Sequence, residues 1–182
     1  MAAVLANWGG YYSQRVYLSE ARRLGLTVRP PHVNFSGRNF KVGPDPQGKV
    51  LFMGMDQVRD LTGRTMDRIL HGRPFHSLED FLSRADPRPH EAENLAKVGA
   101  LENLGTIPAV LRRVQNGGWQ RGQPSLFEWQ DTSGEDWSVE QKNAAQQELL
   151  GISLAAHPLE LLIDKMGKSK ANEEFLMMMQ GS

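Results

Sequence analysis

Residues 54–73 read GMDQVRDLTGRTMDRILHGR, and this stretch decides the fold that we expect. The pattern predicts a short helical element over Met55–Val58 and a second helix over Arg64–Leu70. A tight turn at Asp60-Leu61-Thr62, followed by Gly63, separates the two helices. Two short helices joined by so short a turn have the layout of a helix-hairpin-helix.

A helix-hairpin-helix turn binds duplex DNA without reading its sequence. The N–H groups of the hairpin and the N-terminus of the second helix hold a phosphate. On this interpretation, the candidate DNA-binding residues are Arg59, Thr62, Gly63 and Arg64. A carboxylate at Asp60 would repel that phosphate. From the residues alone, DNA contact and purely structural packing of the turn both stay open, and packing is the simpler alternative.

Three further short helices are expected after this motif. The sequence predicts them over residues 78–83, 91–98 and 107–114. Ser77 and Thr106 are suited to begin the first and the third, because their hydroxyls accept hydrogen bonds from free backbone N–H groups. Gly99 is suited to end the second.

The region before the motif is expected to hold one helix and a small β-hairpin. Apolar spacing predicts a helix over Tyr11–Leu24, and Gly25 is a natural stop. Strand-like runs at Asn39–Val42 and Lys49–Met53 flank a turn that is rich in proline and glycine.

The region after residue 115 is expected to begin with an exposed, glycine-rich linker. Ser138 and Gln141 then form a capping box that starts a helix to about Leu150, and Pro158 starts a last helix. The predicted fold class is mainly α with a small β-hairpin. The predicted parts are an N-terminal region with helix and hairpin, a helix-hairpin-helix-type domain, a linker and C-terminal helices, over residues 1–53, 54–115, 116–137 and 138–182.

The composition excludes several classes of protein. The 182 residues contain no cysteine, which excludes disulfides and thiolate metal sites and fits a cytoplasmic protein. No apolar run is long enough to span a membrane. The net charge of zero hides an asymmetry, because residues 1–73 hold 11 Lys and Arg against 5 Asp and Glu. A basic front half suits contact with phosphates, although an unevenly charged, solvated surface explains it equally well.

No constellation of residues predicts catalysis or metal binding. The five histidines include no pair at ligand spacing on a helix, and no phosphate-binding loop is present. Asp56, Asp60 and Asp67 are spaced to share a helix face, but arginines interleave with them. We therefore expect a surface of ion pairs there, no catalytic residue, no metal site and no cofactor.

The linker contains Gln123-Pro124-Ser125-Leu126-Phe127. Sliding clamps bind extended peptides of the type Gln-x-Ser/Asp-Leu-Phe. In such a peptide the Leu and Phe, here Leu126 and Phe127, are apolar anchors. Gln123 and Ser125 match the polar positions, so a sliding clamp is the expected partner. Chance matches to five residues are common, but this one is complete and lies in a segment expected to be exposed.

The order of these features resembles the bacterial DNA polymerase III alpha subunit and its error-prone relatives, from the end of the fingers region onward. Besides the hairpin and the clamp peptide, seven segments carry the resemblance. They are Met1–Leu5, Gly10–Ser13, Tyr17–Gly25, Pro30–Ser36, Arg73–Phe81, Val98–Gly105 and Glu148–Leu159. Pro30–Ser36 matches Pro-Pro-Asp-Val-Asn-x-Ser except at His32, and Glu148–Leu159 holds the family's Leu-Gly and His-Pro-Leu.

The resemblance implies a non-catalytic piece of a DNA-directed DNA polymerase. The palm carboxylates and their magnesium would lie before residue 1, and an oligonucleotide-binding fold would follow the last helix. The chain is then either an excised piece or the product of a split gene. Its implied partners are the sliding clamp, duplex DNA and the rest of the polymerase.

One departure from the family bears on DNA binding. The family's hairpin is typically Gly-hydrophobic-Gly, and here it is Asp60-Leu61-Thr62. Arg59 and Arg64 are placed to compensate in part. The alternative to a DNA-contacting fragment is a standalone interaction module, from a degenerate or split polymerase gene, that does not bind DNA.

Overall fold

The computed structural model describes residues 14–43, 50–122 and 135–154. Its α-helices are α2 (Gln14–Arg23), α3 (Gly63–Gly72), α4 (Leu78–Ala85), α5 (Pro89–Lys97), α6 (Ile107–Asn116) and α7 (Val139–Leu150). Its strands are β1 (Thr27–Arg29), β2 (Lys41–Val42) and β3 (Val50–Phe52), and two 3-10 helices are η1 (Met55–Gln57) and η2 (Glu102–Leu104). The prediction of a mainly α fold with a small β element is confirmed.

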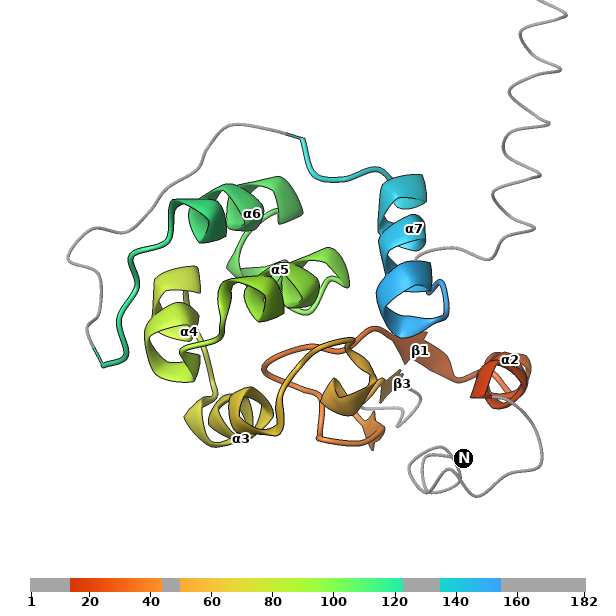
Figure 1. Cartoon of the computed structure of the whole chain (residues 1–182). Coiled ribbons are helices and arrows are strands. Elements are labelled where there is room, and N and C mark those ends of the chain that lie inside the picture. The colour runs from red at the N-terminus through yellow and green to blue at the C-terminus, as the bar shows by residue number, and fades with distance from the viewer. Residues whose placement is uncertain (1–13, 44–49, 123–134, 155–182) are drawn as a thin grey trace, which may run out of the picture.

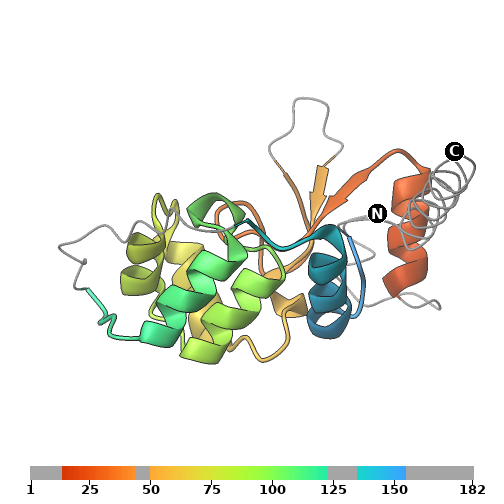
Figure 2. The ribbon, with the colours of Figure 1, turned by 90° about the horizontal axis from the view of Figure 1, so that it is seen from above.

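The helices and the sheet occupy two sides of the molecule. Helices α3 to α6 gather on one side, the sheet and α2 lie on the other, and α7 stands between them (Figure 1). A view from above shows the same elements in a row that runs from α4 to α2 (Figure 2). The larger apolar core lies within the helical side and includes Ile69, Phe75, Phe81 and Leu95.

The predicted helix starts are confirmed at three caps. Ser77 Oγ accepts a hydrogen bond from the Asp80 N–H at 3.1 Å, and Thr106 Oγ1 accepts one from the Ala109 N–H at 3.4 Å. Ser138 forms the expected capping box that starts α7. Each hydroxyl satisfies an N–H group that has no partner within its own helix.

The sheet has one strand more than we predicted. β2 and β3 pair antiparallel, as the hairpin prediction required, but β1 pairs parallel to the other edge of β3. β1 spans only three residues, with a single buried side chain, Val28, between two exposed ones. A segment of three residues is too short for an alternation of apolar and polar side chains to predict a strand. The parallel partner of such a strand is also decided by residues distant in the chain.

Packing joins segments that we had assigned to different parts of the chain. Leu149 of α7 lies in the same core cluster as Phe81 and Leu95, and its carbonyl accepts a hydrogen bond from the Arg59 N–H at 3.2 Å. Leu150 packs on this cluster and also on the second cluster, which contains Leu18 of α2. Helix α7 therefore bridges the helical side and the sheet.

The start of the predicted linker is not free in solution. Trp119 is partly buried against the helical core, and the Gly122 N–H donates to the Ser83 carbonyl at 3.1 Å. Residues 123–134 lie outside the described residues. Among the helices of the described ranges, none has the length and apolar character needed to cross a membrane.

Candidate nucleic-acid interface

The hairpin turn is built on a left-handed residue. Asp60 has a φ of +60°, a conformation that glycine adopts without steric cost and that aspartate tolerates better than most residues. Leu61 is 9% exposed and anchors the turn in the core. Thr62 is extended and is the N-cap of α3. The turn thus joins η1 to α3 through a left-handed residue, a buried leucine and a helix cap, and none of Asp60, Leu61 and Thr62 is a glycine.

The first turn of α3 leaves two donors open. Thr62 Oγ1 accepts from the Thr65 N–H at 3.4 Å. In the described part of the chain, the N–H groups of Gly63 and Arg64 have no acceptor. Gly63 is exposed, and a Cβ added to it would meet no atom within 4 Å, so the space beside this residue is open. Two such N–H groups, at the positive end of a helix dipole, suit an anion.

A buried carboxylate takes the third donor of this turn. Glu91 is 0% exposed, and its oxygens accept from the Thr62 N–H at 2.9 Å and from the Thr65 hydroxyl at 2.8 Å. The Arg88 N–H also donates to it, at 2.8 Å. Glu91 thereby ties the hairpin, α3 and the start of α5 together.

The environment of Glu91 keeps it charged. Burial by itself raises the pKa of its carboxyl, but the donors of Arg88, Thr62 and Thr65 together hold the pKa below the ordinary value of 4.5. We had placed Glu91 at the start of a helix over 91–98, whereas α5 begins at Pro89 and makes Glu91 its third residue. Pro89 at the first helical position and Glu91 two residues later were the signals that could have found this arrangement.

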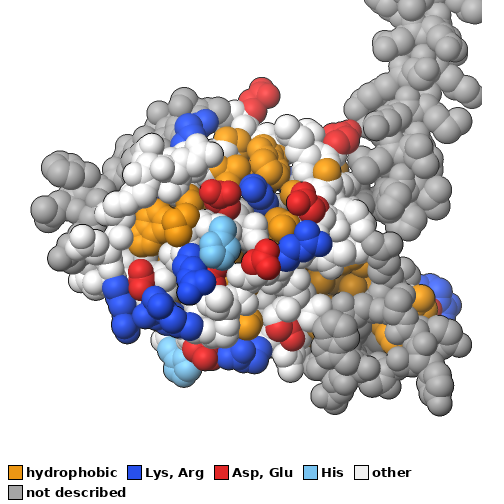
Figure 3. Space-filling view, in the orientation of Figure 1, with side chains coloured by type: hydrophobic (Ala, Val, Ile, Leu, Met, Phe, Trp, Pro, Cys, Tyr) orange, Lys and Arg blue, Asp and Glu red, His pale blue; other side chains and the backbone are white. Residues whose placement is uncertain are grey.

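The arginines of the site differ in whether they form ion pairs with acidic side chains. The Arg64 guanidinium is 3.0 Å from Asp86 Oδ2, and Arg68 approaches the same oxygen at 2.6 Å. Arg59 is exposed and forms no ion pair within the described residues. On the face shown in Figure 3, acidic and basic side chains alternate instead of forming an unbroken positive surface. Charge therefore supports only weak attraction for a nucleic acid.

The three aspartates of the motif do not form a metal site. Asp67 pairs with Arg38, and Asp56 accepts a hydrogen bond from the Gln57 amide at 2.9 Å. In residues 14–43, 50–122 and 135–154, no three His, Asp or Glu side chains come together as metal ligands. The expected ion pairs are thus present in part, with partners from outside the motif.

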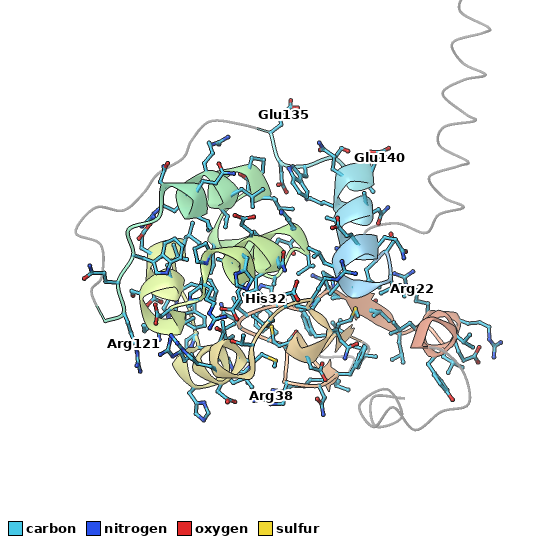
Figure 4. All side chains as sticks on the ribbon, in the orientation of Figure 1. Arg22, His32, Arg38, Arg121, Glu135 and Glu140 are labelled. Atoms are coloured by element: carbon cyan, nitrogen blue, oxygen red, sulfur yellow. The ribbon has the colours of Figure 1, made fainter. Side chains whose placement is uncertain are left out.

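The Pro30–Ser36 segment links the sheet to the helical side. The Asn34 side chain exchanges two hydrogen bonds with the backbone of Phe75, at 2.8 and 2.9 Å. His32, labelled in Figure 4, is buried, and its Nδ1 accepts from the Asn34 N–H at 3.1 Å. This neutral acceptor role explains how a histidine can occupy the position where the family has an aspartate.

The predicted clamp-binding peptide lies outside the described residues, and so do its candidate residues Gln123, Ser125, Leu126 and Phe127. The residues on either side of it are anchored. Gly122 is held at Ser83, and Asp136 Oδ1 accepts from the Ile107 N–H at 3.0 Å. Arg121 and Glu135, which flank the undescribed residues, lie on opposite sides of α6 (Figure 4).

Comparison with known proteins supports both the helix-hairpin-helix and the resemblance to the polymerase subunit. Residues 25–109 match the helix-hairpin-helix motif family. The chain is 29% identical over 179 residues to the DNA polymerase III subunit alpha of Caulobacter vibrioides. The aligned region covers 85% of this chain and 15% of that protein. It is 30% identical over 175 residues to the same subunit of Mycobacterium tuberculosis, and the aligned region covers 79% of this chain and 14% of that protein.

Relatives of both polymerase types match. The subunit of Thermus aquaticus is 38% identical over 106 residues, which are 54% of this chain and 8% of that protein. An error-prone DNA polymerase of Corynebacterium glutamicum is 35% identical over 96 residues. The chain spans a small part of the length of these relatives. It belongs, as a segment that carries the helix-hairpin-helix motif, to the family of the bacterial DNA polymerase III alpha subunit.

Proposed function

We propose that this chain is a non-catalytic part of a bacterial replicative DNA polymerase that contacts duplex DNA through the start of α3. The observation that carries the proposal is the open first turn, where the N–H groups of Gly63 and Arg64 have no acceptor in the described residues. Arg59 and Arg64 add exposed guanidinium groups beside it. Nucleotidyl transfer and its magnesium belong to the rest of the polymerase.

The contact should be weak and independent of sequence. Backbone N–H groups at a helix N-terminus bind phosphate oxygens, and contacts to phosphates position the duplex without specifying its sequence. Asp60, Asp86 and Glu91 lie close to the site and oppose phosphate binding. Binding should therefore be measurable mainly at low salt.

A titration of the 182-residue chain with two fluorescent duplexes of different sequence tests this. Each of Arg59→Gln and Arg64→Gln should weaken binding to both duplexes and lower the slope of log K against log salt by about 1. Arg23→Gln, an exposed arginine on α2 at the other end of the molecule, is the matched control and should bind as the unmodified chain does. Affinity that ignores salt or selects one duplex contradicts the proposal.

We propose sliding-clamp tethering as the second function. The complete Gln-x-Ser-Leu-Phe pattern at residues 123–127 supports it, and so does the place of the peptide between two anchored positions, Gly122 and Asp136. Leu126 and Phe127 would fill an apolar pocket of the clamp.

Calorimetric titration with the cognate clamp tests the tether. The double change Leu126→Ala with Phe127→Ala should remove measurable binding. Pro124→Ala, in the same peptide but at the position that the pattern leaves open, should change affinity less than threefold, about 0.6 kcal/mol. Equal affinity of the double variant and the unmodified chain would show that the peptide is not the clamp ligand.

The standalone interaction module without DNA binding is the alternative. The left-handed Asp60 and the buried Glu91 favour it, because both place negative charge at the turn. Clamp binding together with the absence of salt-dependent DNA binding would select this alternative over the first proposal.

A further inference from the structure

Glu91 occupies the place at the hairpin where an anion would be expected. Its carboxylate is completely buried, and it accepts from the backbone of the turn, at Thr62, and from the side chain of the first helical turn, at Thr65. A phosphate bound to a helix N-terminus uses donors of this kind. The chain therefore already carries an anion on the inner side of the turn.

We propose that the Glu91 carboxylate is the resident anion of the helix-hairpin-helix turn, and that it limits the affinity of the turn for a DNA phosphate. This inference rests on the proposed duplex contact at α3. Glu91 acts in two ways. It takes the Thr62 N–H, which leaves only Gly63 and Arg64 for an outer phosphate, and its negative charge offsets the positive end of the α3 dipole.

Burial makes this charge effective. Solvent screens exposed charges strongly, whereas a carboxylate without solvent exposure is screened far less. Glu93 lies on the same helix α5 and carries the same charge, but it is partly exposed and faces Lys97 at 3.5 Å. Glu91 and Glu93 thus form a matched pair with the same change of formal charge and different access to the turn.

The matched experiment compares Glu91→Gln with Glu93→Gln in the full chain, by anisotropy with a fluorescent duplex at low salt. Glu91→Gln should tighten binding about twofold to fivefold, the range expected for one charge at a helix end. It should also lower the melting temperature, because a Gln side chain cannot accept from all three donors. Glu93→Gln should change affinity less than twofold. If Glu91 had a purely structural role, the less stable Glu91→Gln variant should bind the duplex more weakly than the unmodified chain.

Amide NMR of the unmodified chain gives a second readout that needs no variant of Glu91. Duplex DNA should shift the amide signals of Gly63 and Arg64 and leave the Thr62 amide protected from hydrogen exchange. Loss of that protection on DNA binding, or equal affinities of the two glutamine variants, overturns the inference. If Arg64→Gln binds as tightly as the unmodified chain, the proposed duplex contact fails instead. If Arg64→Gln weakens binding and Glu91→Gln does not tighten it, the resident-anion proposal alone fails.

Discussion

At the scale of single residues, the hairpin places an aspartate where the backbone is left-handed. Asp60 takes the left-handed conformation with a φ of +60°, and its carboxylate makes no hydrogen bond or ion pair within the described residues. Nothing therefore compensates for the steric cost of its Cβ, which glycine would not have.

Asp60→Gly should stabilise the protein by up to about 1 kcal/mol, since relief of the left-handed strain exceeds the added freedom of the unfolded chain. The midpoint of urea unfolding measures this change. Asp86→Gly is the control, because Asp86 is also left-handed, with a φ of +45°, but pairs with Arg64 and Arg68. Stabilisation by Asp86→Gly as large as that by Asp60→Gly would contradict the argument.

His32 should make stability depend on pH. Burial lowers the pKa of this imidazole below its ordinary value of 6.5; the charge of Glu102 opposes this shift and that of Arg29 adds to it. The unfolded chain then binds a proton at a higher pH than the folded one. Stability should thus be unaffected by His32 above pH 6.5 and fall as the pH drops below it, by at most about 1.4 kcal/mol per pH unit.

Urea unfolding at pH 7.5 and 5.5 measures this loss. The loss should shrink in His32→Gln and persist in His71→Gln, whose imidazole is exposed on α3. An equal loss in both variants would assign the pH dependence to other groups.

At the scale of elements, α6 begins with two caps from different parts of the chain. Thr106 satisfies the Ala109 N–H from within the helix start, and Asp136 satisfies the Ile107 N–H from beyond the undescribed residues. Asp136 is in turn 2.6 Å from Lys142 of α7. Because α6 and α7 share this carboxylate, the chain is fixed to the helical side at Asp136.

Asp136→Ala should lower the free energy of unfolding by about 1 kcal/mol, the usual cost of a lost helix cap. Hydrogen exchange of the Ile107 amide should quicken at the same time. The neighbouring, exposed Glu135→Ala should change neither quantity. Unchanged exchange at Ile107 in Asp136→Ala would mean that this contact does not hold the chain at Asp136.

At the scale of the whole molecule, we expect the helical side and the sheet to unfold together, because Leu150 of α7 packs on both core clusters. Leu149→Ala removes a side chain that is 8% exposed from the main core and should cost about 2–4 kcal/mol. Val139→Ala, on the same helix but 45% exposed, should cost less than about 0.5 kcal/mol. Circular dichroism and NMR should report a single transition in both variants. Unfolding of α7 in a separate, earlier transition would contradict this prediction.

The sequence by itself determined the local structure of this protein. Ser77, Thr106 and Ser138 mark helix starts, because capping depends on residues only three positions apart. The ordered motifs were also sufficient to indicate the polymerase family. The duplex contact and the clamp contact remain predictions at the residues named for them.

Only the tertiary structure decided what depends on residues distant in the chain. β1 gains its partner through a parallel pairing across more than twenty residues, and no local pattern specifies that partner. The sequence places Glu91 near the start of a helix, but only folding buries it and brings it to the N–H of Thr62, a residue 29 positions away in the chain. The sequence could indicate a phosphate-binding turn, but only the fold could bring a buried carboxylate to it, because desolvation and hydrogen bonding are properties of the packed structure.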